Sequence, residues 1–560
     1  MIIGLDVGGT HTDAILLGTE GVVRTVKIST DPDALFETIL QALEKTVSGI
    51  DPKSITRAVL STTLATNMVV QQQLPPSGMI VTAGPGIDPK HYRTNEHYYT
   101  VPGALDHRGR EIEPLGKQQV QAIGEDLKRL GIRCAGVVSK FSVRNPIHEN
   151  AMAELLAPYV QHVFKGHACS GSLNFPRRVA TTYLNASVYP VHKAFFEAVE
   201  QSLSQRGFTV PIRILKPDGG NMNFGSSLDH PAQTILSGPS ASVMGALAYA
   251  PKEGTSLVLD IGGTTTDMAV LIDSVPLLAP LGIEIASYKT LIRALQTQSI
   301  GIGGDSAVRI NGGNLSIGPD RMGKAMAYGG PAPTPTDAFC VLGMARQGDR
   351  ENAEKGIASI AGPLGVSVEQ AAKKIFELAC QSILDGAQAM VDRINSKPVY
   401  TVHELWEGSK VHPKELLVLG GPAPQFAEQL RVMFSGRVRV VPHWQVANAI
   451  GCALARTTTE LTLFADTAQG IVTIAGEQHS GNISSHFELE DARQMALELL
   501  REKALRRGAA AGQLKTEIIE ESQFNMIRGF NTIGKNIRVR AQVKPGLIEG
   551  YEIAQNNHEP

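Results

Sequence analysis

A chain of 560 residues, 42% of them hydrophobic, can build several packed cores, and its length predicts three or four domain-sized units. The formal net charge of −2 provides no basic field, so we expect neither nucleic acid nor an anionic membrane as a partner. The five cysteines are scattered without a C-x-x-C pair, which argues against a disulfide framework. Neither a signal-peptide pattern nor an apolar run of roughly 20 residues occurs, so we expect a cytoplasmic protein.

The most informative feature is an eight-residue motif that occurs twice. Residues 6–13 read D-V-G-G-T-H-T-D, and residues 260–267 read D-I-G-G-T-T-T-D. Each copy lies between two apolar runs, which predicts a strand, a tight glycine turn and a second strand. Adjacent glycines lack the Cβ atoms that keep an anion away from the backbone N–H groups, and the Thr hydroxyls add donors. The two copies together predict a nucleoside triphosphate held from two sides by related hairpins.

In the first half of the chain, short Val- and Ile-rich runs alternate with amphipathic stretches, as in an α/β fold. Residues 85–114 carry Pro, Gly, His and Tyr without periodicity and are predicted to form an irregular surface excursion. Ser237 is predicted to cap a helix that runs to Ala250. The other expected elements are strands at 22–28, 58–61, 78–82 and 135–140, and helices at 34–47, from 62 onward and at 179–204.

The second half begins with another glycine turn at 301–305 and a Gly- and Pro-rich stretch at 312–335 that is predicted to be a loop. Ser367 is placed to cap a long helix. Beyond residue 457 the pattern changes, which predicts a separate α+β appendage. The expected elements are helices at 368–394, 445–455 and 489–507, and strands at 416–419, 438–442, 470–475, 515–520 and 536–543.

The duplicated motif also sets the expected domain organisation. Its two copies begin 254 residues apart, at 6 and 260, a spacing too long for a solenoid repeat. We therefore expect two large related lobes, at 1–178 and 179–456, followed by the appendage at 457–560.

Asp6 and Asp260 are the best candidates for catalysis and for metal binding, because each ends the first strand of its hairpin. A carboxylate there suits a water-retaining Mg²⁺ that the phosphates also hold, or it orients the attacking group. The alternative is local capping of the turn. Asp13 and Asp267 are expected to stabilise the turns. The predicted nucleotide-binding residues come from the two turns and from two later glycine pairs: Gly8, Gly9, Thr10, His11, Thr12, Gly262, Gly263, Thr264, Thr265, Gly303, Gly304, Gly420 and Gly421.

The paired D-x-G-G-T-x-T-D loops and the later strand that ends in Gly-Gly resemble the ATPase superfamily of actin, sugar kinases and heat-shock chaperones. The resemblance implies two related ribonuclease-H-like lobes with insertions, joined here to a small α+β C-terminal domain. In that superfamily the hairpins are the phosphate loops and the late Gly-Gly belongs to the adenosine motif.

Further segments resemble the hydantoinase A and 5-oxoprolinase family. They are S-T-T-L-A-T-N at 61–67, N-P-I-H-E at 145–149, T-I-L-S-G-P at 234–239, P-T-P-T-D-A at 333–338 and N-A-I-G at 448–451. This resemblance implies ATP- and Mg²⁺-dependent ring opening of a cyclic amide such as 5-oxoproline or a hydantoin, through phosphorylation of the carbonyl oxygen. It also implies a separate hydantoinase B-type subunit as partner. A small-molecule kinase, an ATP-dependent carboxylase component and a non-catalytic ATP-binding switch subunit stay open as alternatives.

Four positions depart from the usual pattern of that family. Phe426 stands where a His follows the late Gly-Gly, and K-P-D-G-G at 216–220 stands where S-N-G-G is typical. Asp305 replaces a small residue, and His11 replaces a Phe. If the family's His is catalytic or binds a metal, its replacement by Phe426 predicts weak or absent ring opening by the isolated chain. The alternative is that this His has only a packing role in the relatives.

Overall fold

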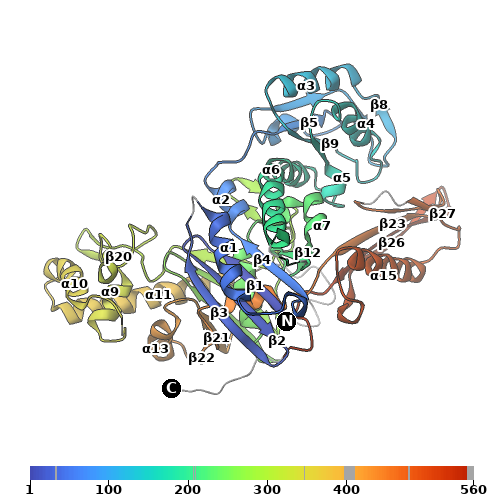
Figure 1. The fold of residues 1–560 in the computed structure, drawn as a ribbon. Coiled ribbons are helices and arrows are strands. Elements are labelled where there is room, and N and C mark those ends of the chain that lie inside the picture. Colours follow the sequence, from blue (N-terminus) through green and yellow to red (C-terminus); the bar gives the residue numbers. More distant parts are fainter. Residues whose placement is uncertain are drawn as a thin grey trace.

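Two mixed sheets with the same strand order form the centre of the molecule (Figure 1). The computed structural model describes residues 1–31, 34–205, 207–208, 210–345, 347–396, 410–476 and 480–551. In each sheet, the first strand of the motif hairpin pairs antiparallel with the second strand of the same hairpin. That first strand also pairs parallel with a strand from later in the chain, and a further strand pairs parallel with this later one. This shared topology confirms the predicted α/β class and the two related ribonuclease-H-like lobes.

The first sheet has the order β12-β11-β4-β1-β2-β3. Its central strands are buried on both faces, as expected for strands that helices cover on both sides. β11 and β12 lie beyond the expected lobe boundary at residue 178, and the division into 1–178, 179–456 and 457–560 stays a prediction. The strands are β1 (Ile2–Val7), β2 (His11–Gly18), β3 (Gly21–Ser29), β4 (Arg57–Thr62), β11 (Ile212–Leu215) and β12 (Asn221–Asn223), with the helices α1 (Leu35–Val47), α2 (Leu64–Val70), α6 (Phe175–Gln205), α7 (Phe224–Asp229) and α8 (Ser237–Leu247).

The second sheet has the order β15-β14-β13-β21-β22, and β18 pairs with β14. Its strands are β13 (Thr255–Ile261), β14 (Thr266–Ile272), β15 (Val275–Pro276), β18 (Thr297–Ile300), β21 (Glu415–Leu419) and β22 (Arg437–Val440); α13 (Ala423–Met433) and α14 (Ala447–Leu454) follow β21 and β22, and β16 (Glu284–Ile285) pairs with β17 (Tyr288–Lys289).

An inserted α/β domain stands on the first lobe (Figure 1). Its four strands are all parallel, in the order β10-β9-β5-β6. The prediction of an irregular excursion at 85–114 is wrong in part, because β6 and the hairpin β7-β8 lie within it; these strands are short and lack the alternating pattern that marks a strand. The elements are β5 (Gly78–Thr82), β6 (Tyr98–Val101), β7 (Ala104–Leu105), β8 (Glu111–Glu113), β9 (Cys134–Val138), β10 (His162–Lys165), α3 (Lys117–Arg129), α4 (Ile147–Leu156) and α5 (Gly166–Cys169).

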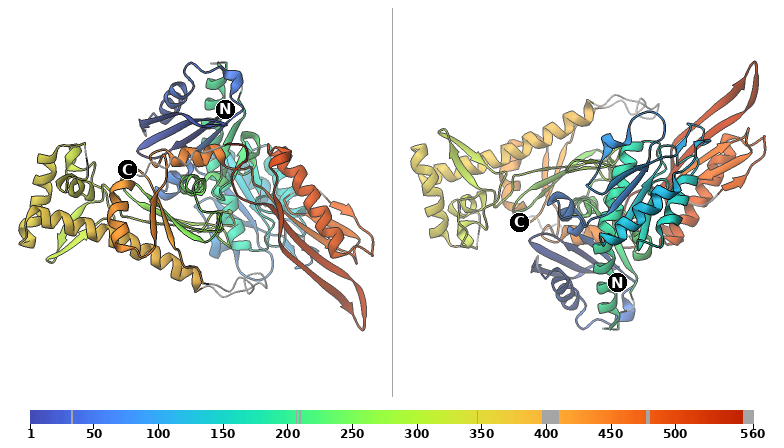
Figure 2. Two further views of the ribbon diagram at one scale, coloured as in Figure 1. Left: turned by 90° about the horizontal axis from the view of Figure 1, so that it is seen from below. Right: turned by 90° about the horizontal axis from the view of Figure 1, so that it is seen from above.

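A helical insertion extends the second lobe on the opposite side of the molecule (Figure 2). Ser367 caps its longest helix, α11, and forms a capping box with Gln370, which confirms that prediction. The stretch at 312–335, predicted to be a loop, contributes β20 and a short 3-10 helix. The elements are β19 (Val308–Asn311), β20 (Asn314–Ile317), α9 (Pro335–Val341), α10 (Arg350–Leu364) and α11 (Val368–Asn395).

The C-terminal α+β unit is a five-stranded sheet with one helix packed on it, as predicted. Its two longest strands form a hairpin that projects from the body of the molecule (Figure 2). The elements are β23 (Glu460–Asp466), β24 (Ile471–Ile474), β25 (Ser480–Asn482), α15 (Leu489–Arg506), β26 (Thr516–Arg528) and β27 (Asn531–Val543). Within the parts of the chain that the structure describes, none of the helices combines the length and the apolar character that a bilayer crossing requires.

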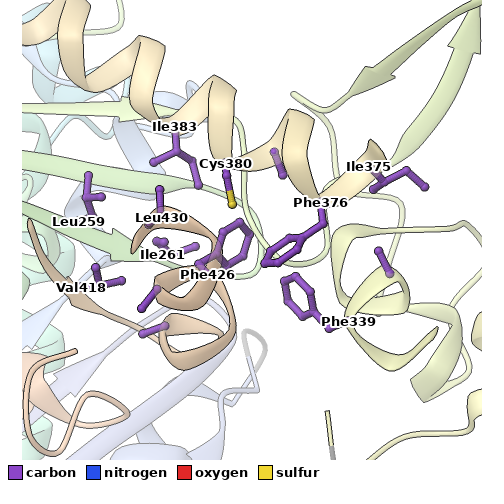
Figure 3. Close-up of a cluster of buried hydrophobic side chains, with 14 of the residues drawn as sticks. Leu259, Ile261, Phe339, Ile375, Phe376, Cys380, Ile383, Val418, Phe426 and Leu430 are labelled. Carbon is purple, nitrogen blue, oxygen red and sulfur yellow. The ribbon is translucent and has the colours of Figure 1, made fainter. Parts of the chain in front are cut away.

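Phe426 lies in the largest apolar core of the molecule (Figure 3). Its ring is fully buried and makes edge contacts with the rings of Phe339 and Phe376, at centroid distances of 5.2 and 5.5 Å. Such contacts stabilise a core beyond the burial of apolar area alone. This position of α13 therefore packs the helical insertion against the second sheet, which favours the alternative that the family's His only packs, and the weak ring opening of the isolated chain stays a prediction.

The helices α8 and α14 cross between the two sheets with their backbones in contact. A Cβ added to Gly451 would lie 2.1 Å from the carbonyl oxygen of Ala241, and one added to Gly245 would lie 2.1 Å from that of Ala447. A Cβ on Gly4 of β1 would lie 2.0 Å from the carbonyl oxygen of Ala449. Only glycine permits this approach, which brings α14 onto β1 of the first lobe.

We expect Gly451→Ala to destabilise the protein, because the added methyl group must push α8 and α14 apart. Forcing an extra carbon into a packed contact costs about 1–3 kcal/mol. Thermal unfolding followed by circular dichroism measures the effect. Gly362→Ala is the matched control, since no atom lies within 4 Å of its added Cβ on α10; an equal loss in both variants would contradict the expectation.

Candidate functional site

The two copies of the motif have the same local structure. In the first turn the N–H of Gly8 donates to the carbonyl of His11 (3.0 Å), and in the second the N–H of Gly262 donates to that of Thr265 (2.9 Å). The paired aspartates of each motif lie opposite each other across their hairpin. The sequence repeat is therefore a structural repeat, one copy in each lobe.

The later glycine pairs support the second hairpin. The N–H of Gly304 donates to the carbonyl of Gly262 (2.9 Å), and a Cβ on Gly303 would lie 2.6 Å from that same oxygen. Gly420 has φ +95°, and its Cβ would lie 2.2 Å from the carbonyl oxygen of Ile261. The structure thus brings both pairs to the site, but it buries Gly303 and Gly304 beneath the turn.

Gly9 and Gly421 have a different environment. Both are exposed, and a Cβ on either residue would meet no protein atom within 4 Å. Packing therefore does not require glycine at these two positions. The space beside the backbone suits the close approach of a ligand, such as the phosphates and the ribose of a nucleotide.

Of the other turn residues, Thr10 and His11 are exposed at the tip of the first hairpin, and Thr264 and Thr265 are partly exposed at the second. Thr12 differs from the prediction: its side chain is fully buried, and its hydroxyl bonds to that of Thr30 at 2.9 Å. Side chains alternate along a strand, so Thr12 points into the first lobe. It is a structural residue of the hairpin.

Three cations lie near the tip of the first hairpin. Burial, followed by the charges of Lys27, Arg321 and Lys324, lowers the pKa of His11 below its ordinary value. Arg321 and Lys324 come from the second lobe, and Arg321 is held by Asp305 at 2.8 Å. This surrounding positive charge suits phosphate groups between the hairpins.

Asp6 offers a carboxylate oxygen with no partner. One oxygen, Oδ2, accepts from Nδ2 of Asn448 on α14 (3.1 Å), while Oδ1 is buried and has no hydrogen-bond partner among the described residues. Burial raises the pKa of Asp6 more than the hydrogen bonds of Ser61 and Asn448 lower it. An unpartnered buried carboxylate oxygen is costly unless a cation or its water binds there.

Asp260 of the second lobe is held by Ser242 of α8, whose hydroxyl donates to it at 2.5 Å. Burial and the charge of Asp267, together with those of Asp6 and Asp13, raise its pKa to about 7. Four carboxylates from two lobes thus share one region. No group of three or more His, Cys, Asp or Glu side chains in the described ranges forms a complete metal site. Mg²⁺ usually needs only one or two carboxylates, because it keeps several waters and the phosphates supply the rest, so Asp6 and Asp260 fit it.

Sequence reasoning missed the residues that position the two carboxylates. Asn448, Ser61 and Ser237 lie in three of the family-like segments, and this resemblance could have identified them. Ser242 lies outside these segments, so the sequence offered no sign of its role. Ser237 does not act as a helix cap as predicted: α8 begins at Ser237, and the hydroxyl donates to the carbonyl of Thr62 at 3.0 Å. This bond attaches α8 to the end of β4, beside the first hairpin.

Comparison with known proteins gives consistent results. The model of the hydantoinase/oxoprolinase family matches residues 178–461, and that of the hydantoinase/oxoprolinase N-terminal region matches residues 2–160. The chain is 25% identical over 508 residues to the caprolactamase subunit alpha of Pseudomonas jessenii, which covers 82% of this chain and 70% of that subunit. It is 27% identical over 435 residues to the acetophenone carboxylase gamma subunit of Aromatoleum aromaticum, covering 67% and 58%.

The crystal structure of the ATP-dependent caprolactamase from Pseudomonas jessenii superposes on this chain with a TM-score of 0.73 at 21% identity. The superposition covers 99% of this chain and 88% of the other. At this identity the likeness shows the fold, and it extends over the inserted domains and the C-terminal unit as well as the two lobes.

We expect Asp260→Asn to stabilise the protein in the absence of divalent cations, and more at pH 8 than at pH 5. A carboxyl group whose pKa rises on folding lowers the free energy of unfolding. This loss grows as the pH rises from the unfolded pKa of about 3.9 to the folded pKa of about 7. One pKa unit corresponds to about 1.4 kcal/mol, so the gain at pH 8 is on the order of 1 kcal/mol or more. Denaturant unfolding in a chelating buffer measures it, with Asp385→Asn on the exposed side of α11 as control. An equal gain at both pH values would refute this account.

Proposed function

Because the chain belongs to the hydantoinase/oxoprolinase family, we propose that it uses ATP and Mg²⁺ to open a cyclic amide such as 5-oxoproline or a hydantoin. The observation that carries the proposal is the duplicated hairpin, one copy per lobe, with an open glycine near each turn (Gly9 and Gly421), the buried Asp6 in the first copy and the partly buried Asp260 in the second. The relative named as an ATP-dependent caprolactamase supports both the use of ATP and an amide ring as substrate.

An amide carbonyl is a poor electrophile, and transfer of the γ-phosphoryl group of ATP to its oxygen makes the carbon open to attack by water. The ring C–N bond then breaks to leave an acyl phosphate, and a second water hydrolyses it, so the overall products are the open-chain acid, ADP and phosphate. Phosphoryl transfer depends mainly on positioning and on stabilising charge. Mg²⁺, when bound, supplies part of that charge neutralisation.

The chain's own residues have distinct roles in this proposal. The N–H groups of the two turns, with Thr10 and Thr265, bind the phosphates from opposite sides. Asp6, oriented by Asn448, would help to hold Mg²⁺ through its unpartnered oxygen. Asp260, with a pKa of about 7, can accept a proton from the attacking water near neutral pH. Gly421 leaves room for the adenosine, and Gly420 keeps the end of β21 against the second hairpin.

A second candidate function is that of an ATP-dependent carboxylase component, and the similarity to a subunit of acetophenone carboxylase favours it. The two hairpins would serve either reaction, since both need an activating phosphoryl transfer. A small-molecule kinase and a non-catalytic switch subunit use the same hairpins as well. Product analysis with ATP and a panel of cyclic amides and ketones separates them: a ring-opened acid with ADP, a carboxylated ketone, a stable phosphorylated compound, or nucleotide binding without turnover.

We expect Asp6→Asn and Asp260→Asn each to reduce Mg²⁺-dependent ATP hydrolysis by about 10²-fold or more, the usual cost of removing a group that stabilises the transition state. Phosphate release measures the rate, and circular dichroism verifies the fold. Asp13→Asn is the matched control, because Asp13 pairs with Lys27 at 2.6 Å and has no assigned role in the reaction. Wild-type turnover by the Asp6→Asn protein would overturn the assignment.

We also propose that a hydantoinase B-type subunit binds the projecting β26-β27 hairpin. The named relatives are subunits of larger enzymes. Near its tip the hairpin carries large apolar side chains that are at least half exposed: Phe524, Ile527, Phe530 and Ile533. Exposed apolar clusters of this kind mark protein interfaces.

We expect the double variant Phe524→Ser, Phe530→Ser to bind the B-type subunit encoded in the same genome at least tenfold more weakly. The reason is that large aromatic side chains contribute most of the binding energy of an interface. Co-expression followed by size-exclusion chromatography detects the complex. ATP binding by the variant should be unchanged. Val432→Ser on α13, another strongly exposed apolar residue, is the control; retention of the complex by the double variant would show that the subunit binds elsewhere.

A further inference from the structure

A cavity of about 260 Å³ lies where the first sheet meets the C-terminal unit. Arg57 of β4 and Arg213 of β11 line it, together with Arg456 between α14 and β23. Residues of the segments 509–513 and 548–551 line much of the rest. Within the described ranges no turn residue of the two motif hairpins reaches this lining, so the cavity is distinct from the nucleotide site.

The charges that line this cavity have one sign. Three arginines line it, and among the described residues no Asp or Glu does. β4 and β11 are neighbouring parallel strands with Arg213 opposite Val59, so Arg57, two positions before Val59, lies on the same face of the sheet as Arg213. Like charges this close repel each other unless an anion lies between them.

The pKa values agree with this geometry. Burial, followed by the charge of Arg213, lowers the pKa of Arg57 to about 10, and burial also lowers the pKa of Arg213. Arg456 is 4% exposed, and burial lowers its pKa as well. The environment of all three guanidinium groups thus disfavours their charge, as expected where a counter-ion is missing.

The carboxylates of the described chain do not neutralise these arginines. None of the three guanidinium groups forms an ion pair with an Asp or Glu of the described residues. Glu549 acts on Arg456 from outside the lining, but it already pairs with Lys515 at 2.6 Å. The positive charge of the cavity is therefore left largely uncompensated.

Neutral acceptors hold two of the arginines in place. Nη2 of Arg57 donates to the carbonyl of Ala453 at the end of α14 (2.5 Å), and Nη2 of Arg456 donates to that of Leu547 (2.8 Å). The end of a helix carries only a partial negative charge, about half of one elementary charge. These bonds fix the positions of the guanidinium groups without supplying a full counter-charge.

Arg213 is held by a side chain, because its Nη1 donates to the hydroxyl of Thr457 at 2.7 Å. In Arg57, Arg213 and Arg456 alike, the Nε atom is buried and has no hydrogen-bond partner in the described part of the chain. A buried donor without a partner is costly. Three such donors around one cavity indicate a ligand that accepts hydrogen bonds.

A larger cavity, of about 650 Å³, has a different lining. It lies between the inserted domain, the first lobe and the C-terminal unit, and carboxylates line it beside its cations. Its Arg293, for example, lies between Asp218 and Glu460, at 3.7 and 3.8 Å. The absence of carboxylates therefore distinguishes the smaller cavity.

The size and charge of the smaller cavity define the class of ligand. Pockets for drug-sized molecules measure about 300–1,000 Å³, so 260 Å³ suits a smaller group than a nucleotide. Arginine favours phosphate and carboxylate oxygens, because its planar fork donates parallel hydrogen bonds. Three positive charges match a dianion with several oxygens better than they match a single carboxylate.

We propose that this cavity binds a small dianionic oxyanion of the phosphate type, separately from the nucleotide held by the two hairpins. The anion links β4 and β11 of the first sheet to the C-terminal unit at the end of α14, the helix whose Asn448 holds Asp6. The proposal does not depend on which reaction the hairpins serve.

Isothermal titration of the full chain with inorganic phosphate tests the proposal, at pH 8 and constant ionic strength. A non-hydrolysable ATP analogue and Mg²⁺ are present at saturation, so that the hairpins are occupied. We expect phosphate to bind, and acetate, a monoanion, to bind at least tenfold more weakly. Arg57→Gln and Arg456→Gln should each weaken phosphate binding at least tenfold, because each removes a charged donor.

Arg24→Gln is the matched control, because Nη1 of Arg24 also donates to carbonyls at the end of a helix, those of Thr46 (3.0 Å) and Ser48 (2.7 Å), outside the cavity. It should change the affinity less than twofold. Arg213→Gln provides a second route if the other cavity variants fail to fold, which circular dichroism detects. Phosphate should raise the melting temperature of the wild type and not that of Arg213→Gln, since a ligand stabilises only the state that binds it.

Absence of phosphate binding to the wild type would overturn the proposal. It would also be overturned if the folded cavity variants bound phosphate as tightly as the wild type. An equal loss in Arg24→Gln would show that the affinity follows helix stability, and equal binding of acetate would refute the assignment to the phosphate class.

Discussion

The backbone contact between α8 and α14 is the constraint on which the site depends. Glycines at 4, 245 and 451 let two helices and a strand approach to distances that any side chain would prevent. Each helix then holds one carboxylate: Asn448 of α14 holds Asp6 in the first lobe, and Ser242 of α8 holds Asp260 in the second. If this contact opened, the hairpins would keep their local shapes but would lose their relative position.

This arrangement has an electrostatic cost. Asp6, Asp13, Asp260 and Asp267 all have raised pKa values, chiefly because of desolvation, and among the described residues only Asp13 of these four forms an ion pair, with Lys27. Close-packed helices and sheets hold the four carboxylates together against their mutual repulsion. Sites of this kind bind cations well because the protein has already met the cost of assembling the negative charge. In the proposed function, this assembled charge would serve the reaction at the expense of local stability.

The glycines near the site fall into two physical classes. Gly303 and Gly420 are required by packing, because a Cβ there would overlap the backbone of the second hairpin. Gly9 and Gly421 face open space, so their lack of a side chain matters only to what approaches from outside. The inserted domain and the C-terminal unit contribute, together with the first lobe, to the lining of a separate cavity.

The sequence alone determined the features that depend on neighbouring residues. The hairpins follow from strand–Gly-Gly–strand patterns, the long helices from their periodicity, and the N-cap of α11 from Ser367. Only the tertiary structure decided which distant residues meet. Asn448 and Asp6 are 442 positions apart, β11 joins a sheet that begins at residue 2, and Phe426 turns into a core built by α9 and α11. Such pairings cannot be predicted from neighbouring residues in the sequence, because they result from how whole lobes pack. The same packing decided which of the predicted residues face a ligand.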